Sequence, residues 1–351
     1  MGRTRQVESL QIFIDFRGMA QIYLKLVLLL CFVISTIIYL AHKIFHVTTE
    51  TGESCISMFM GGFYAMDDFG QKGTWYAPCE LIYRSTINES ADCLRKSSVY
   101  LGKENHIVLI GDSRIRQLRD GLIYHLSGVE HDFYVNPAIA YDQQLYKKHE
   151  STVTSIPTAN LLIEFFWSVE MDEEGGTFGH ALRTLESKGS KPDMIIIGAG
   201  IWVMKVCTYQ KISQVECLRN FKKNLIKPLQ MLNRFADTGT VLWTPQNLVD
   251  EPRLLNLEYS HKELTNKNMM YYNNAIRKHL LMDPLNKIIY WESYLQTDLQ
   301  IDDTPDGLHV GPTTRNIDIQ FLLNYLCNPY MEKDYFDFRD RFSRRNICCQ
   351  R

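Results

Sequence analysis

Two patterns of apolar and polar positions alternate along most of the chain. Short, continuously apolar runs are typical of strands buried on both faces of a sheet, whereas apolar residues at every third or fourth position are typical of amphipathic helices. The apolar runs cover residues 106–110, 193–202 (where the run ends in a glycine turn), 240–245 and 287–291. The helical pattern covers residues 115–126, 217–235, 266–282 and 313–326.

This alternation predicts an α/β fold, in which a parallel central sheet lies between two layers of helices. In such sheets the carboxyl ends of the strands meet at one edge, where binding and catalytic sites form. The segments that follow predicted strands or lie in late loops are Ser113, Gly198–Gly200, residues 245–247 and residues 306–309. We therefore expect these segments to converge at that edge.

Residues 22–41 depart from this globular pattern, because they are almost wholly apolar and carry a single charge, Lys25. A run of about 20 apolar residues matches the bilayer core at helical rise. More basic residues precede the run than follow it, so the positive-inside rule leaves the N-terminus in the cytoplasm. We expect an uncleaved transmembrane signal-anchor; a cleaved signal peptide and a buried core helix are the alternatives.

The anchor divides the chain into parts with different expected structures. Residues 55–104 are rich in glycine, aromatic residues and cysteine, and we expect them to form an irregular lead-in tied by disulfides. The predicted parts are residues 1–21, a cytoplasmic N-terminus; 22–41, the anchor; 42–54, a stem; 55–329, the main α/β domain; and 330–351, a C-terminal linker.

The composition is that of an ordinary globular protein, because 45% of the 351 residues are hydrophobic and 22% are charged. The net charge of -2 gives no basis for nucleic-acid binding. The sequence contains no zinc-ligand spacing and no glycine motif for phosphates or dinucleotides, so we expect no bound metal or cofactor.

Two further features favour a lumenal or extracellular location for the main domain. Asn88-Glu89-Ser90 is an acceptor sequence for N-glycosylation. Of nine cysteines, Cys31 lies in the apolar run and an even number lies outside it. We expect disulfides, whose pairing the sequence leaves open; buried free thiols are the alternative. These cysteines are Cys55, Cys79, Cys93, Cys207, Cys217, Cys327, Cys348 and Cys349.

A serine stands between the first predicted strand and the first predicted helix. Gly111, Asp112, Ser113 and Arg114 fill the gap between them. A sharp strand-to-helix turn exposes the serine hydroxyl and directs the positive end of a helix at charge that develops beside it. The simpler interpretation is a helix start in which Asp112 or Ser113 is the N-cap.

A carboxylate and an imidazole lie near the other end of the chain, in Asp306-Gly307-Leu308-His309. Alone, either residue is more often structural, but with Ser113 they supply the nucleophile, base and orienting carboxylate of acyl transfer. In these roles Ser113 attacks an acyl carbonyl, His309 takes and returns the proton, and Asp306 stabilises the imidazolium.

Further residues are candidates for binding. The N–H groups of Ser113 and of Gly198–Gly200 are candidate oxyanion donors, although the glycines also suit a tight turn that allows close packing. Trp202 is a candidate pocket wall or a core residue. Arg114 and Arg116 are candidates to bind a substrate carboxylate or phosphate, or are solvated helix residues.

Three segments together resemble the SGNH/GDSL hydrolase superfamily: residues 110–118, 198–202 and 306–309. The order, with the serine first and Asp-x-x-His last, fits that superfamily. The same segments, followed by Cys327-Asn328, are similar to the lumenal domain of the sialate O-acetyltransferases. The cysteines of the lead-in and the terminal Cys348-Cys349 also fit that domain.

The resemblance implies a three-layer SGNH-type catalytic domain at residues 55–329, with Ser113, Asp306 and His309 as its triad. It implies transfer of acetyl from acetyl-CoA, as co-substrate, through an acetyl-serine to a hydroxyl of sialic acid, CMP-sialic acid or another glycan. It also implies a Golgi membrane protein with a single span and a lumenal catalytic domain.

The sequence departs from the family pattern in two ways. Residues 198–202 lack the asparagine that usually completes the oxyanion hole, and the chain ends at Arg351, where family members continue into a multi-span membrane domain. We therefore expect a fragment, a short isoform or a reduced paralogue. An acetylesterase with the same triad and an inactive lumenal binding protein are the alternative functions.

Overall fold

The computed structural model describes Ser35 and residues 57–60, 63–66, 73–76, 83–141, 149–171, 176–255, 262–292 and 303–327. The chain divides into two units, residues 1–52 and 53–351, and the elements below belong to the second unit. The predicted anchor, stem and linker lie outside the described residues, apart from Ser35. Among the described residues, no helix has the length and apolar character that crossing a membrane requires.

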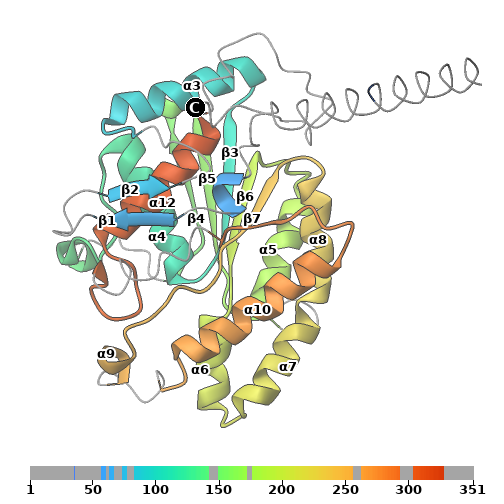
Figure 1. The fold of residues 1–351 in the computed structure, drawn as a ribbon. Helices are drawn as coiled ribbons and strands as arrows, with labels where there is room; N and C mark the ends of the chain where they lie inside the picture. The colour runs from blue at the N-terminus through green and yellow to red at the C-terminus, as the bar shows by residue number, and fades with distance from the viewer. Residues whose placement is uncertain are drawn as a thin grey trace, which may run out of the picture. The chain divides into compact units, whose positions relative to one another are not determined.

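A sheet of six strands in the order β4-β5-β3-β6-β7-β8 forms the centre of the domain (Figure 1). The five strands from β5 to β8 in this order run parallel, as predicted, whereas β4 is antiparallel to β5. Only residues 157–160 connect β4 to β5, too few for the crossover that a parallel pair requires. The strands are β3 (Asn105–Gly111), β4 (Thr152–Ile156), β5 (Leu161–Trp167), β6 (Met194–Gly198), β7 (Thr240–Trp243) and β8 (Ile289–Tyr290).

Helices cover both faces of this sheet, so the predicted three layers are present (Figure 1). Successive side chains of β3 point to opposite faces, and Leu109 accordingly belongs to one hydrophobic core while Val108 and Ile110 belong to the other. The first face carries α3 (Ile87–Leu101), α4 (Ser113–Ser127) and α12 (Pro312–Leu326). The second carries α5 (Gly176–Ser187), α6 (Ile201–Tyr209), α7 (Gln214–Asn224), α8 (Ile226–Ala236) and α10 (Asn266–Met282).

The lead-in is more regular than expected. Residues 87–101 form α3, whose start is a capping box in which Thr86 accepts from the Glu89 amide and Glu89 accepts from the Thr86 amide. Gly102, at φ 63°, ends the helix in the left-handed conformation that favours glycine. The shorter elements are α2 (Ser57–Met60), α9 (Glu251–Leu255) and the antiparallel pair β1 (Phe63–Met66) and β2 (Gly73–Tyr76).

The single helix predicted over residues 217–235 is two helices, α7 and α8, which meet at Leu225. The cause is Pro228, because a proline ring clashes with the carbonyl four residues earlier, here that of Asn224, and has no N–H to donate to it. By contrast, α10 covers the predicted residues 266–282, and α12 begins one residue before its predicted start.

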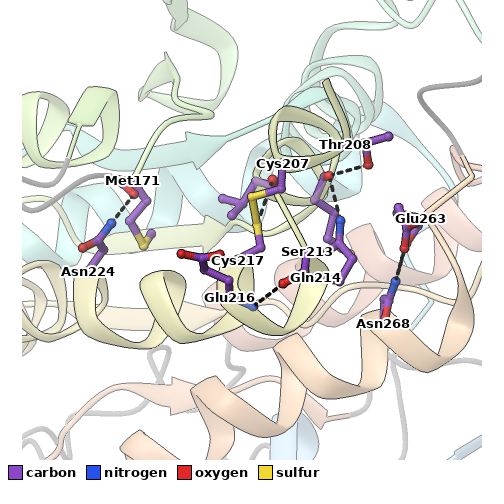
Figure 2. Close-up of a disulfide and its surroundings, with 12 residues drawn as sticks. Met171, Cys207, Thr208, Ser213, Gln214, Glu216, Cys217, Asn224, Glu263 and Asn268 are labelled. Carbon is purple, nitrogen blue, oxygen red and sulfur yellow. Dashed lines mark hydrogen bonds between the residues drawn. A yellow bond between two sulfur atoms is a disulfide. The ribbon is translucent and has the colours of Figure 1, made fainter. Parts of the chain in front are cut away.

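Two disulfides lie in the described part of the chain, which confirms the expected use of cysteine. Cys93 of α3 pairs with Cys327, which follows α12. Cys207 of α6 pairs with Cys217 of α7, and Figure 2 shows this bond beside the Ser213 cap of α7. Asn88, the predicted glycosylation site, is exposed in the first turn of α3. The disulfides therefore fasten helices to one another on both faces of the sheet.

We expect the Cys93–Cys327 bond to stabilise the domain more than the Cys207–Cys217 bond does. The first joins residues 234 positions apart and the second only 10. In the chain-entropy model these loops correspond to about 5 and about 3 kcal/mol. Urea unfolding of the C93A/C327A and C207A/C217A double variants measures the difference, and equal losses of stability would contradict it.

Candidate active site

The turn between β3 and α4 presents Ser113 as the first residue of the helix. Asp112 is the N-cap, and its carboxylate accepts a hydrogen bond from the Arg114 amide at 3.0 Å. A Cβ atom at Gly111 would lie 2.6 Å from the Gly198 carbonyl oxygen and 2.5 Å from Cγ1 of Ile115. Glycine therefore allows the strand end, its neighbour and the helix to approach closely enough for the sharp turn.

The structure brings the three predicted catalytic residues together. His309 Nε2 lies 2.7 Å from Ser113 Oγ, and His309 Nδ1 lies 2.7 Å from Asp306 Oδ2. The other carboxylate oxygen of Asp306 accepts hydrogen bonds from the amides of Leu308 and His309 at 2.9 and 2.8 Å. Three groups thus form one hydrogen-bonded chain from carboxylate to imidazole to hydroxyl, as a nucleophilic serine requires.

The ionisation of Asp306 determines which nitrogen of His309 carries the proton. Burial of the carboxyl raises its pKa, but the hydrogen bonds and the charge of His309 outweigh that effect and lower the pKa to about 2. An ionised carboxylate only accepts, so the proton between these two residues belongs to Nδ1. The lone pair of a neutral His309 is then on Nε2, directed at the Ser113 hydroxyl that it would deprotonate.

Thr304 and Tyr134 hold the loop that carries His309. Thr304 accepts from the Gly307 amide at 3.0 Å and donates to the His309 carbonyl at 2.6 Å. Tyr134 stacks on the imidazole, with ring centroids 3.8 Å apart and planes inclined by 21°. No sequence pattern pointed to Tyr134, which lies in an irregular segment 175 positions before His309.

The two glycines proposed as oxyanion donors lie at the carboxyl end of β6. Gly198 is in register with Gly111 on β3. A Cβ atom at Gly198 would lie 2.6 Å from Thr244 Oγ1. A Cβ atom at Gly200, whose φ is 145°, would lie 3.1 Å from Gln246 Cδ. The structure therefore shows the close packing that these glycines were expected to allow, and their oxyanion role stays a prediction.

Arg114 and Arg116 are buried, at 4% and 3% exposure, and so are not solvated helix residues. The Arg114 guanidinium donates to the side-chain oxygen of Gln246, whose amide nitrogen donates to the Ala199 carbonyl at 2.7 Å. Gln246 thereby joins the serine turn to the glycine turn that follows β6. Substrate binding by Arg114 stays a prediction, and the observed contact is this internal connection.

Trp202, in the first turn of α6, belongs to an aromatic cluster and is partly exposed. Its ring lies 5.9 Å from that of Trp167 and 5.7 Å from that of His149, and the Lys205 ammonium is 4.9 Å from it. Trp167 ends β5 opposite Gly111, so the cluster is at the same edge of the sheet as Ser113. This position suits the predicted pocket wall.

The described residues include no group of three or more His, Cys, Asp or Glu side chains arranged to hold a metal ion.

No family model matches the chain. Among curated proteins, N-acetylneuraminate (7)9-O-acetyltransferase of Danio rerio is 27% identical over 295 residues. The chain is a distant homologue of this acetyltransferase. The match covers 82% of the chain but 33% of the relative, so the chain spans about a third of the relative's length.

Among solved structures, an alpha/beta hydrolase enzyme from the metagenome of Lake Arreo, Spain, is 16% identical. The similarity covers 64% of this chain and 94% of that one, with a TM-score of 0.34. A similarity at this level supports no conclusion about function, which depends on the site itself.

We expect Asp306 to make stability depend on pH at the acid end. Its pKa is about 2 in the folded chain and near 3.8 when unfolded, so its contribution is present above the unfolded value and is lost as pH falls toward 2. Between about pH 5 and pH 2, wild-type stability should fall about 1–2 kcal/mol more than that of D306N. Urea unfolding at both pH values measures this difference.

The D92N variant, which removes an exposed carboxyl from α3, is the control for loss of a negative charge. It should keep the wild-type dependence on pH. A D306N variant with the same acid dependence as the wild type would show that Asp306 gains nothing from His309 in the folded state.

Proposed function

We propose that this chain is a serine-dependent O-acetyltransferase, which moves acetyl from acetyl-CoA to a hydroxyl of sialic acid or CMP-sialic acid. The observation that supports this most directly is the continuous hydrogen bonding from Asp306 through His309 to Ser113. The distant homology to an N-acetylneuraminate O-acetyltransferase supports the transfer of an acetyl group and the choice of acceptor.

In the first half of the proposed reaction, Ser113 Oγ attacks the thioester carbonyl while His309 Nε2 takes the hydroxyl proton. The carbon–sulfur bond then breaks, acetyl stays on Ser113, and the departing sulfur receives the proton from His309 to give CoA as a free thiol. The Asp306 carboxylate stabilises the imidazolium that exists between these two proton transfers.

In the second half, the sugar hydroxyl attacks the acetyl carbonyl and gives its proton to His309. The bond from the acetyl carbon to Ser113 breaks, and Ser113 recovers the proton as the acetylated sugar leaves. Both tetrahedral intermediates place negative charge on the carbonyl oxygen, which we assign to the N–H groups of Ser113, Gly198 and Gly200.

We further propose that the domain works in the lumen of the Golgi, behind a membrane anchor at residues 22–41. The two disulfides support this location, because such bonds persist in oxidising compartments and are rare in the cytosol. The exposed position of Asn88 is compatible with glycosylation there.

A single incubation tests the function. The full chain and its S113A variant are mixed with isotope-labelled acetyl-CoA, with and without CMP-sialic acid, and mass spectrometry detects acetylated sugar and acetyl on Ser113. Loss of the nucleophile should lower turnover by at least about 10³-fold. The S187A variant, which removes an exposed hydroxyl from the end of α5, should keep wild-type activity.

Labelled sugar that depends on Ser113 would support the transferase. Labelled acetate that depends on Ser113, with no labelled sugar, would replace the transferase with an acetylesterase, because water then attacks the same acetyl-serine. If folded wild-type chain gave neither product nor acetyl on Ser113, the proposal would be wrong.

A further inference from the structure

The residue next to His309 is held on both of its backbone groups by one side chain. Gln117 Oε1 accepts from the Val310 amide at 3.2 Å, and Gln117 Nε2 donates to the Val310 carbonyl at 3.0 Å. Gln117 is completely buried and lies on α4, one turn after Ser113. The helix that carries the serine therefore also holds the segment that carries the imidazole.

Asp132 fixes the orientation of that glutamine. Gln117 Nε2 also donates to Asp132 Oδ2 at 3.0 Å. The two ends of a glutamine amide have nearly the same shape, but a carboxylate only accepts and so selects the nitrogen end. With the nitrogen directed at Asp132, the oxygen faces the Val310 amide.

The same carboxylate reaches His309 by a second route. Asp132 Oδ1 accepts from the Tyr134 amide at 2.9 Å, and the Tyr134 ring stacks on the imidazole at 3.8 Å. Asp132 thus connects to the backbone beside His309 through Gln117 and to its ring through Tyr134. Its exposed fraction is 1%, so water does not replace these contacts.

Arg315 of α12 compensates the buried charge of Asp132. It donates to Asp132 at 3.3 Å and to both oxygens of Glu130 at 2.9 and 2.8 Å. Glu130 in turn accepts from the Asp132 amide at 2.9 Å. Removal of one partner from a buried ion pair is strongly destabilising, so these contacts favour the observed arrangement of the loop at residues 130–134.

We propose that Asp132 is a positioning residue for the imidazole of His309, acting through Gln117 and Tyr134 without touching the reacting atoms. The inference rests on the proposed function in that His309 is the base. The alignment of Nε2 with the serine hydroxyl depends on where α4 and the loop at residues 130–134 hold the ring.

The D132N variant is the direct test, because the amide has the same shape as the carboxylate but only one accepting atom. Its NH₂ group faces either the donors of Gln117 and Arg315 or the amide of Tyr134, so one restraint on His309 is lost in both orientations. With p-nitrophenyl acetate, which needs no sugar acceptor, kcat should fall by about 10- to 100-fold and KM should change little.

A matched control is D318N, on the same helix as Arg315. Asp318 is also completely buried, and burial raises the pKa of its carboxyl well above the usual range, so D318N makes the same Asp-to-Asn change at a second buried carboxyl. The kcat of D318N should stay close to wild type. A loss in D318N as large as that in D132N would mean that any change in the buried interior has this effect, and would overturn the inference.

Tyr134 offers a second pair of variants. Y134L removes the stacked ring and should lower kcat as D132N does, whereas Y134F keeps the ring and should lower kcat much less than Y134L. If Y134L kept wild-type kcat and KM, the second route from Asp132 to His309 would be wrong.

A measurement independent of turnover separates this inference from the proposed function. When the histidines of the protein are labelled with ¹⁵N, NMR detects the Nδ1 proton between His309 and Asp306. Its resonance is assigned by its absence in H309Q. We expect this resonance to shift or broaden in D132N and to stay unchanged in D318N. An unchanged resonance in D132N would overturn the positioning role, whereas a wild type that turned over no ester would overturn the proposed function alone.

Discussion

β3 is hydrogen-bonded to a parallel neighbour along each of its edges, and this double pairing fixes where the nucleophile stands. β5 and β6 stay in register with β3 up to Gly111, which lies opposite Trp167 and Gly198. A side chain at Gly111 would overlap the Gly198 carbonyl and Ile115, so the backbones meet only because that position is glycine. The strand can then turn at once into α4, with Ser113 at the carboxyl edge of the sheet.

The helix that follows is unusual in how much charge it buries. Arg119 and Asp120 are 2% and 1% exposed, and the Arg119 Nε donates to the Asp120 carboxylate at 2.7 Å. Burial raises the pKa of Asp120 to about 6 even though Arg116 and Arg119 oppose it. Arg119 also reaches the sheet, because its guanidinium donates to Thr152 Oγ1 of β4 at 2.6 Å and lies 5.3 Å from the centre of the Phe165 ring of β5. Rotation of α4 would break these contacts, so they help to hold the helix that carries Ser113 and Gln117.

Much of the fold could be predicted because its causes are local. Continuously apolar runs identified β3, β6, β7 and β8, and helical spacing identified α4, α10 and α12. β5 was missed because Glu164 interrupts its apolar run; in the folded chain this carboxylate is paired with Lys188 at 3.3 Å. The break between α7 and α8 had a local signal in Pro228, and the start of α3 had one in the Thr86–Glu89 capping box. Each signal determines the local structure more strongly than the composition of the surrounding segment does.

The sequence by itself determined the chemical groups of the site, because Ser113 follows a buried strand and Asp306 and His309 are three positions apart in one loop. Only the tertiary structure decided which residues support them. Gln117 contacts Val310, Tyr134 contacts His309, and Asp132 is paired with Arg315 of α12. The partners in each of these contacts are 175 to 193 positions apart, and no periodicity or spacing in the sequence encodes such contacts. Arg114 shows the same limit: its place beside the serine suggested substrate binding, which stays a prediction, and only the structure showed that it is buried against Gln246. Local sequence sets which groups are available, and the packing of distant segments sets what each group faces.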